Sequence, residues 1–277
     1  MKLLTANRAI KLLYNFIQVN HISGRVLLPA NICPEVVKML TFAGMQPQFL
    51  DLQVETLCLD MQAALDQAKD AQMIIFVHTF GTEQEFAPFF QLLREQNPDI
   101  IIIDDKCLCL PDLELKQSEA DLVLYSTGER KMVPLGGGAI GYLADKWEYD
   151  EVAVEGCDCL SNELWLLDPK QLYQRMDTII SHKDKLNTIY SQMLPAAIQL
   201  PDQFQHWRFN ILVQNRDEIL AALEAEGLKA ETYYPSQDEA CLVASNLHSF
   251  LVSLSNDKLT SQEQAIRACE VICGLLG

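Results

Sequence analysis

Ser126 and Lys131 lie five residues apart in segment 123–143, VLYSTGERKMVPLGGGAIGYL. A strand-like apolar run ends at Ser126, and three glycines at 136–138 follow the lysine. The GxxxxGKS/T pattern is absent and no GxGxxG directly follows the first predicted strand, so a nucleotide-binding loop is not indicated. Glycines also let a backbone approach a ligand or another chain segment closely. Lys131 is therefore either a solvated loop charge or an amine placed for chemistry, since a site that lowers the pKa of a lysine makes it a nucleophile.

Polar side chains that could act with this lysine also come at the ends of apolar runs. His78 ends the run MIIFVH, and Asp104 and Asp105 end the run DIIIIDD. In sheets of parallel strands, ligands gather beyond the carboxyl ends of the strands. We therefore expect these three side chains and Ser126 to converge at one edge of a sheet.

The elements that must position these residues follow from the apolar pattern. The runs are continuous rather than alternating, which is typical of strands covered on both faces, and helical patterns separate them. This order predicts an α/β fold with a mainly parallel sheet. Strands are expected at 26–30, 47–52, 73–78, 99–105, 121–126 and 137–143, and helices at 8–18, 35–43, 60–68 and 85–95.

Beyond about residue 145 the pattern changes to that of a smaller α+β unit. A polar, acidic stretch precedes a long helix at about 169–194, and the last helix has a capping pattern at Thr260 or Ser261 with Gln264 behind it. We expect a large domain at 1–165 and a small domain at 166–277. Its other elements are strands at 206–213, 229–235 and 249–254, and helices at 216–227 and 260–276.

Composition narrows the function classes. The 277 residues are 49% apolar and 21% charged, which is typical of a globular protein. The net charge of -17 argues against a general nucleic-acid or membrane-surface binder, so an anionic substrate would need a locally positive site. The nine cysteines include two CxC pairs, 107/109 and 157/159, which lack the CxxC spacing of zinc ribbons. With no apolar signal region at the N-terminus, we expect reduced, mostly buried thiols in a cytoplasmic protein without a metal, with metal or redox use of the cysteines as the alternative.

The order of Asp105, Ser126 and Lys131 resembles that of the fold-type I pyridoxal-phosphate enzymes, in particular the DegT/StrS nucleotide-sugar aminotransferase family. That family shows an acid and then Asp at a strand end, later Ser-x-x-x-x-Lys, and then a Gly-Gly turn. Here DD, STGERK and GGGA follow the same order. Further segments are similar to family segments along nearly the whole chain: LLPANICPEVVKMLTFAGMQPQFLDLQVETLCLD, FVHTFG and RDEILAALEAEGLKAETYYP.

The resemblance implies an aspartate aminotransferase-like large domain with a smaller C-terminal domain, and pyridoxal 5'-phosphate (PLP) as cofactor. Lys131 would form a Schiff base with the cofactor aldehyde and later move protons. Asp105 would pair with the pyridine nitrogen, so that the ring acts as an electron sink. Ser126 would bind the cofactor phosphate together with Arg8 and Ala9, which start the first helix, because a helix N-terminus suits an anion.

Other positions align less closely with the family. Cys33 falls where the family has an aromatic side chain over the cofactor ring, and Leu108 falls where it has Gln or His. Tyr234 and His78 are candidate substrate-site residues. The alternative for Tyr234 is an exposed position on a strand, and the alternative for His78 is a structural role at a strand end. Asn162 is the candidate for an asparagine that reaches the partner subunit.

The implied activity is transfer of an amino group from an amino acid, with glutamate as the expected donor, to a keto-sugar nucleotide. A homodimer and small-molecule substrates are expected, without nucleic-acid or membrane partners. Since the phosphate turn lies at 6–10, near the start of this sequence, and Cys33 and Leu108 depart from the family, a second hypothesis stays open: a relative that keeps the fold for binding or assembly without transamination.

Overall fold

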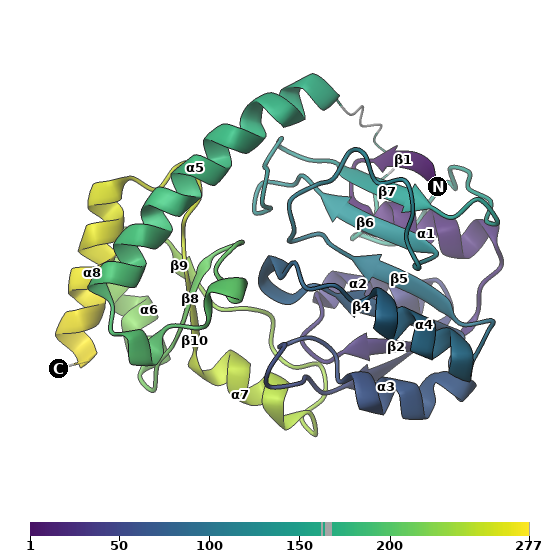
Figure 1. The fold of residues 1–277 in the computed structure, drawn as a ribbon, viewed down its shortest axis with the longest axis horizontal. Helices are drawn as coiled ribbons and strands as arrows, with labels where there is room; N and C mark the ends of the chain where they lie inside the picture. The colour runs from purple at the N-terminus through teal and green to yellow at the C-terminus, as the bar shows by residue number, and fades with distance from the viewer. Residues whose placement is uncertain (162, 164–167, 277) are drawn as a thin grey trace.

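The computed structural model describes residues 1–161, 163 and 168–276 and shows a seven-stranded sheet beside a three-stranded sheet (Figure 1). The large sheet has the order β1-β7-β6-β5-β4-β2-β3, and β2 to β6 run parallel where they pair. Its strands are β1 (Lys2–Ala6), β2 (Gly24–Pro29), β3 (Met45–Leu50), β4 (Met73–Val77), β5 (Ile101–Asp105), β6 (Leu122–Ser126) and β7 (Ala139–Leu143). The prediction of a mainly parallel α/β sheet is confirmed.

Strand β1 was not expected from the sequence. It pairs antiparallel with β7, with Lys2 opposite Leu143 and Ala6 opposite Ala139, and β7 in turn pairs antiparallel with β6. The five residues KLLTA are too short and too exposed to show a clear period, so only their pairing with β7 makes them a strand. This pairing also places the start of the next helix beside the end of β6 and the start of β7.

Helices cover both faces of the large sheet, which explains its continuous apolar runs. Helices α1 (Ala9–Val19) and α2 (Pro34–Phe42) share a core with the β4 and β5 residues of one face. Helices α3 (Met61–Gln67) and α4 (Ala87–Gln96) share a second core with the β4 and β5 residues of the opposite face. Fully buried side chains such as Leu12 and Phe16 each contribute about 1.5–3 kcal/mol to this packing.

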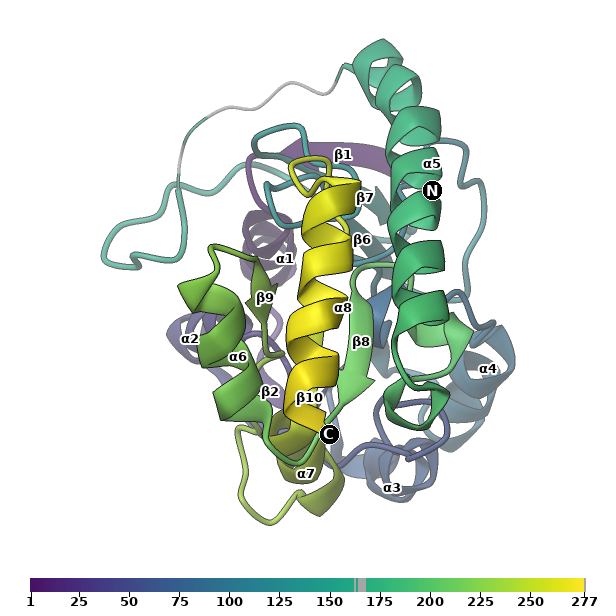
Figure 2. The ribbon, with the colours of Figure 1, turned by 90° about the vertical axis from the view of Figure 1, so that its left-hand side faces the viewer.

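The C-terminal part builds its own core around the small sheet of order β8-β10-β9 (Figure 2). Its strands are β8 (Phe209–Leu212), β9 (Ala230–Glu231) and β10 (Leu251–Leu254), and its helices are α5 (Pro169–Met193), α6 (Arg216–Ala225), α7 (Leu242–Phe250) and α8 (Gln262–Leu276). The strand expected at 229–235 is only two residues long, and α7 was missed. The capping prediction is confirmed at Ser261, whose Oγ accepts from the Gln264 amide at 3.2 Å while Gln264 Oε1 accepts from the Ser261 amide.

Helix α5 joins the two parts. Leu172 and Ile179 near its start belong to the core under the large sheet, whereas Leu186 and Tyr190 near its end belong to the core of the small one. Its C-terminal half packs beside α8 (Figures 1 and 2). The expected domain boundary at 165/166 and the candidate Asn162 lie outside the described residues, so the division into domains stays a prediction.

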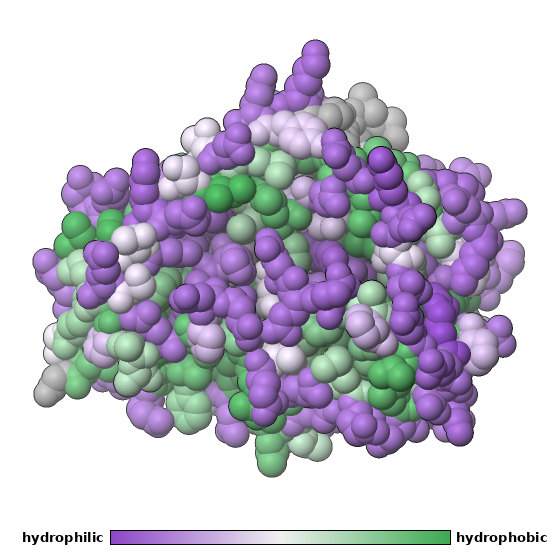
Figure 3. Space-filling model, viewed as in Figure 1, coloured by the Kyte–Doolittle hydropathy of each residue, from purple (hydrophilic) through white to green (hydrophobic). Residues whose placement is uncertain are grey.

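Hydrophilic side chains cover most of the face seen in Figure 3, and apolar surface lies between them in separate patches. Across the described residues, no helix is both long and apolar enough to cross a membrane. The two chain ends lie at opposite ends of the molecule (Figure 1).

Candidate active site

Most of the sequence-predicted residues, though neither His78 nor Asp104, converge on a cavity of about 680 Å³ between the two sheets. Its lining comes from the start of α1, the ends of β5 and β6, the glycine-rich loop, and the segment after β9. Seven candidates line it: Arg8, Ala9, Cys33, Asp105, Ser126, Lys131 and Tyr234. His78 is not among its lining residues.

Asp105 is the last residue of β5 and lies half-buried at the cavity wall. Its Oδ1 accepts a hydrogen bond from the Cys107 amide at 2.9 Å, so the turn that follows the strand holds the carboxylate in place. On the next strand Leu124 lies opposite Asp105 in the register, which brings Ser126 to the same edge of the sheet. The carboxylate therefore has a fixed position and further lone pairs available to a ligand.

Ser126 and Lys131 are brought together by a turn at Gly128. The Lys131 amide donates to the Gly128 carbonyl at 3.0 Å. A Cβ added to Gly128 would lie 3.7 Å from both Lys131 Cγ and Ser126 Oγ, so the lysine stem and the serine hydroxyl flank this glycine. The two residues, five positions apart in the sequence, therefore lie on either side of Gly128 in the cavity wall.

The glycines at 136–138 close the loop behind the lysine. Thr127 donates from its amide to the Gly138 carbonyl at 2.9 Å and from Oγ1 to the Gly137 carbonyl at 2.7 Å. Gly138 has φ +97°, a left-handed conformation that glycine adopts without strain, and its amide donates to the Asn7 carbonyl at 2.8 Å. The loop is therefore docked on the turn that precedes α1.

The N-terminus of α1 faces the cavity with Ala9 and Ile10. The first amide groups of a helix have no partner within it, and the first turn of α1 carries no acidic residue. Asn7 Oδ1 is buried without a hydrogen-bond partner. Arg8, by contrast, is engaged by protein groups: its guanidinium pairs with Glu35 and donates to the Cys159 carbonyl at 2.9 Å.

Cys33 and Tyr234, far apart in the sequence, are neighbours in the cavity. Burial raises the pKa of the Tyr234 hydroxyl, and the adjacent Cys33 thiol raises it further. The ring of Tyr234 lies 4.9 Å from that of Tyr233, centroid to centroid. Leu108 lines the same cavity and belongs to a buried cluster with Phe80 and Tyr233.

His78 lies in a second cavity, of about 630 Å³, on the other side of β5. It is 2% exposed, and its Nε2 lies 2.7 Å from Asp104 Oδ1 while its Nδ1 lies 2.8 Å from the Thr82 carbonyl oxygen. Lys106 Nζ approaches the other carboxylate oxygen of Asp104 at 3.5 Å. Successive side chains of a strand point to opposite faces, so the pair of acids is divided between two cavities. His78 thus stays a substrate-site prediction that the geometry of the first cavity does not support.

Sequence reasoning missed the residues that the C-terminal part contributes to the cavity wall, chiefly Trp207 and Glu231. Glu231 Oε2 lies 3.4 Å from Arg130 Nη1, and its Oε1 lies 3.6 Å from Arg208 Nε. Glu231 is a single acidic residue in the short segment KAETYYP, and nothing in that segment predicts a position at a cavity wall. These contacts depend on how the two parts pack, which local patterns do not encode.

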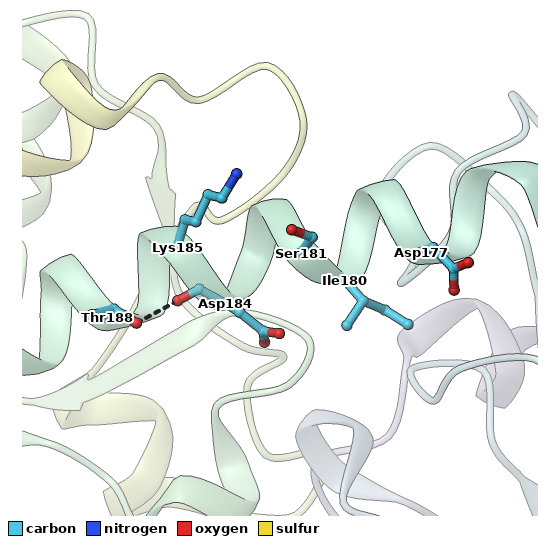
Figure 4. Close-up of a pocket in the computed structure, with 6 residues that line it drawn as sticks. All are labelled: Asp177, Ile180, Ser181, Asp184, Lys185 and Thr188. Atoms are coloured by element: carbon cyan, nitrogen blue, oxygen red, sulfur yellow. Dashed lines mark hydrogen bonds between the residues drawn. The ribbon is translucent and has the colours of Figure 1, made fainter.

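Two other features lie apart from this cavity. A hollow along α5 is lined by one exposed side of the helix, and Figure 4 shows Lys185, Asp184 and Asp177 spread along it rather than converging. The Cys157 and Cys159 Sγ atoms are 3.0 Å apart. Among the described residues, no three His, Cys, Asp or Glu side chains are grouped as metal ligands.

Comparison with known proteins bears on the fold of this chain. No family model matches the sequence. No curated protein matches it either. Solved structures do: a DegT DnrJ EryC1 StrS aminotransferase from Brucella abortus has a TM-score of 0.76 and 16% identity, covering 100% of this chain and 86% of the other.

Two further solved structures are similar to this chain over nearly its whole length. A candidate sugar aminotransferase from Streptococcus pneumoniae, in its PLP form, has a TM-score of 0.79 and 15% identity over 97% of this chain and 85% of that one. An aminotransferase of pseudoaminic acid biosynthesis from Helicobacter pylori has a TM-score of 0.76 and 13% identity over 99% and 86%. The chain therefore has the fold of the PLP-dependent sugar aminotransferases of the DegT/StrS kind, as the order of Asp105, Ser126 and Lys131 predicted.

Proposed function

We propose that this protein binds PLP through a Schiff base with Lys131 and transfers an amino group from an amino acid to a sugar ketone. We further propose glutamate as the donor, a keto-sugar nucleotide as the acceptor, and a cytoplasmic homodimer as the working form. The observation that supports the proposal most directly is the convergence of Lys131, Asp105 and Ser126 on one cavity.

The residues present fit the phosphate end of such a cofactor. The amides of Ala9 and Ile10 at the start of α1 form the kind of site that binds phosphate. Ser126 is 8% exposed and has a hydroxyl that can donate to an anion. Nothing lies within 4 Å of a Cβ built on Gly136 or Gly137, so the loop leaves space beside the helix.

The other end of the cavity fits the ring of the cofactor. When bound, PLP supplies an electron sink that stabilises negative charge on the substrate carbon. The Asp105 carboxylate would hold a proton on the ring nitrogen through a charge-assisted hydrogen bond. The Lys131 amine would attach the cofactor and afterwards move the proton at the substrate carbon. Tyr234 and Cys33 line the same cavity as these groups.

A second candidate function rests on the arrangement of Arg8 and Cys33. Arg8 is neutralised by Glu35, and Cys33 offers only a small surface where an aromatic side chain would cover a ring. A protein that keeps the fold and binds PLP or a related anion, without transamination, is consistent with both. The two functions differ in whether an amino donor changes the bound cofactor.

The test is reconstitution with PLP, borohydride reduction of the carbon–nitrogen double bond, and peptide mapping. We expect one adduct on Lys131 that disappears in Lys131→Ala and persists in Lys185→Ala, a matched change on the exposed side of α5. An unchanged adduct in Lys131→Ala would disprove the cofactor assignment. Adding glutamate to the loaded protein should then produce the pyridoxamine form; an unchanged absorption spectrum with every amino donor would favour the binding function.

A further inference from the structure

The indole of Trp207 binds the backbone next to Lys131. Its Nε1 donates to the Arg130 carbonyl at 2.7 Å, and Arg130 immediately precedes the lysine. Trp207 lies just before β8, whereas Arg130 lies in the loop that follows β6, so the bond joins the two parts of the protein across the cavity that both residues line.

Trp207 is itself anchored from several sides. Its carbonyl accepts from Lys183 Nζ on α5 at 2.8 Å, and its amide donates to the Phe80 carbonyl at 3.2 Å. Its ring packs edge-on against Tyr233, with centroids 5.9 Å apart, and the Arg208 guanidinium carbon lies 5.0 Å from its centroid. A side chain held in this way is 6% exposed and presents its N–H in a fixed direction.

Two other contacts reach the same loop from the C-terminal part, and they differ in expected strength. The Arg130–Glu231 ion pair involves an arginine side chain that is 74% exposed, and such surface pairs contribute little because water screens them. Arg175 donates to the Pro134 carbonyl at 3.1 Å, three residues after Lys131. The Trp207 bond is the shortest of the three, and its donor is the most deeply buried.

We propose that Trp207 is a positioning residue for Lys131. By holding the Arg130 carbonyl, it fixes where the lysine stem leaves the loop and so directs the amine into the cavity. The placement of the amine then depends on how the C-terminal part docks on the large sheet. This inference rests on the proposed function for the role of the amine, whereas the hold on the loop can be tested without any cofactor.

The experiment compares Trp207→Phe with Trp147→Phe. Trp147 is the matched control because its Nε1 also donates a hydrogen bond, to Asp121 Oδ1 at 2.8 Å, away from the cavity. Replacing Trp207 by benzothienylalanine, which keeps the shape of the indole and removes only the N–H, guards against a folding defect. Amide hydrogen exchange of the 128–134 peptide is measured without cofactor, and the rate of covalent PLP attachment is measured from absorbance at saturating PLP.

Since one hydrogen bond contributes about 0.5–1.5 kcal/mol, both Trp207 changes should raise exchange in this peptide and slow attachment about two- to thirteenfold. The control should leave both unchanged. Exchange and attachment equal to those of the control would overturn the proposal, and so would faster exchange with an unaltered attachment rate. If the wild-type protein attaches no PLP, the proposed function fails, while raised exchange in the Trp207 variants would still support the hold on the loop.

Discussion

His78 and Asp104 form a buried pair, with 2.7 Å between Nε2 and Oδ1, directly behind the strand end that presents Asp105 to the main cavity. The side chains of the pair are 2% and 5% exposed. The Thr82 carbonyl can only accept a hydrogen bond, so His78 Nδ1 donates to it, and Nε2 is the ring nitrogen that faces Asp104. The pair therefore stabilises the strand end without facing the proposed cofactor site.

Breaking this pair should cost stability rather than cofactor affinity. His78→Leu leaves the buried Asp104 carboxylate with Lys106 as its charged partner, and removal of one partner of a buried pair costs about 3–5 kcal/mol. Urea denaturation of the His78→Leu protein should show such a loss. Asp145→Asn, at an exposed acid of the same second cavity, is the control and should change stability by less than about 0.5 kcal/mol. A loss below about 1 kcal/mol in His78→Leu would contradict the buried pair.

Asp105→Asn should weaken the chemistry while leaving the fold intact. The Asn oxygen can still accept from the Cys107 amide, so the turn persists, but the negative charge opposite a ring nitrogen is lost. A hydrogen bond to a charged group contributes about 1.5–3 kcal/mol, so PLP affinity or the rate of pyridoxamine formation should fall about 10- to 150-fold. Spectroscopic titration with PLP and stopped-flow mixing with glutamate measure the two. Equal affinity and equal rate would show that Asp105 does not contact the cofactor.

The glycines behind Lys131 provide a test of backbone conformation. Gly136 has φ +86°, Gly137 lies outside the left-handed region, and an added Cβ meets nothing within 4 Å at either position. Gly136→Ala should therefore destabilise the protein by about 1–2 kcal/mol through backbone strain alone, and Gly137→Ala should be nearly neutral. Thermal unfolding of the two variants side by side checks this, and equal midpoints would refute the assigned loop conformation.

Releasing Arg8 should strengthen anion binding. Glu35 pairs with its guanidinium, and both side chains are about two-fifths exposed. Glu35→Gln removes the competing charge, so Arg8 becomes available beside the α1 N-terminus, and an interaction of about 0.5–1 kcal/mol would tighten PLP binding roughly two- to fivefold. The gain should shrink as salt is added. Weaker binding in Glu35→Gln would mean that the ion pair itself shapes the site.

Lys183 should make stability depend on pH in the alkaline range. Burial lowers its pKa to about 7, the nearby Arg208 charge acts in the same direction, and Asp257 opposes them. The unfolded chain, with a pKa of about 10.4, then binds more protons than the folded one between pH 7 and 10. The free energy of unfolding therefore rises with pH through that window, by on the order of a few kcal/mol. Below about pH 7 the buried amine is charged, and its full destabilising effect is present.

The check is the slope of the urea midpoint against pH, from 7 to 10, in the wild-type protein and in Lys183→Met. The upward slope should be smaller in the variant because the titrating amine is gone. The variant also loses hydrogen bonds to the Trp207 carbonyl and Asn256 Oδ1, which lowers its stability at every pH without altering the slope. Parallel slopes would show that the Lys183 amine titrates normally.

Several features of the protein could be determined from its sequence. Continuous apolar runs such as MIIFV and IIIDD predicted buried strands correctly, since burial on both faces requires apolar side chains at consecutive positions. The order of Asp105, Ser126 and Lys131 carried the resemblance that predicted the fold. Seven residues named from strand ends or from that resemblance line one cavity, whereas the strand-end candidates His78 and Asp104 line another. These features are local or follow from the rule that parallel strands end at one edge.

The rest depended on the tertiary structure. Strand β1 exists because β7 pairs with it, and the contacts of Trp207, Glu231 and Tyr234 arise only when the C-terminal part packs over the cavity. Adjacent side chains at the end of β5 point to opposite faces, so Asp104 and its partner His78 lie away from the cavity that Asp105 lines. Arg8 pairs with Glu35 because α2 packs close to the start of α1. Such long-range contacts have no period or spacing in the sequence, because they are selected by the packing of whole elements against one another.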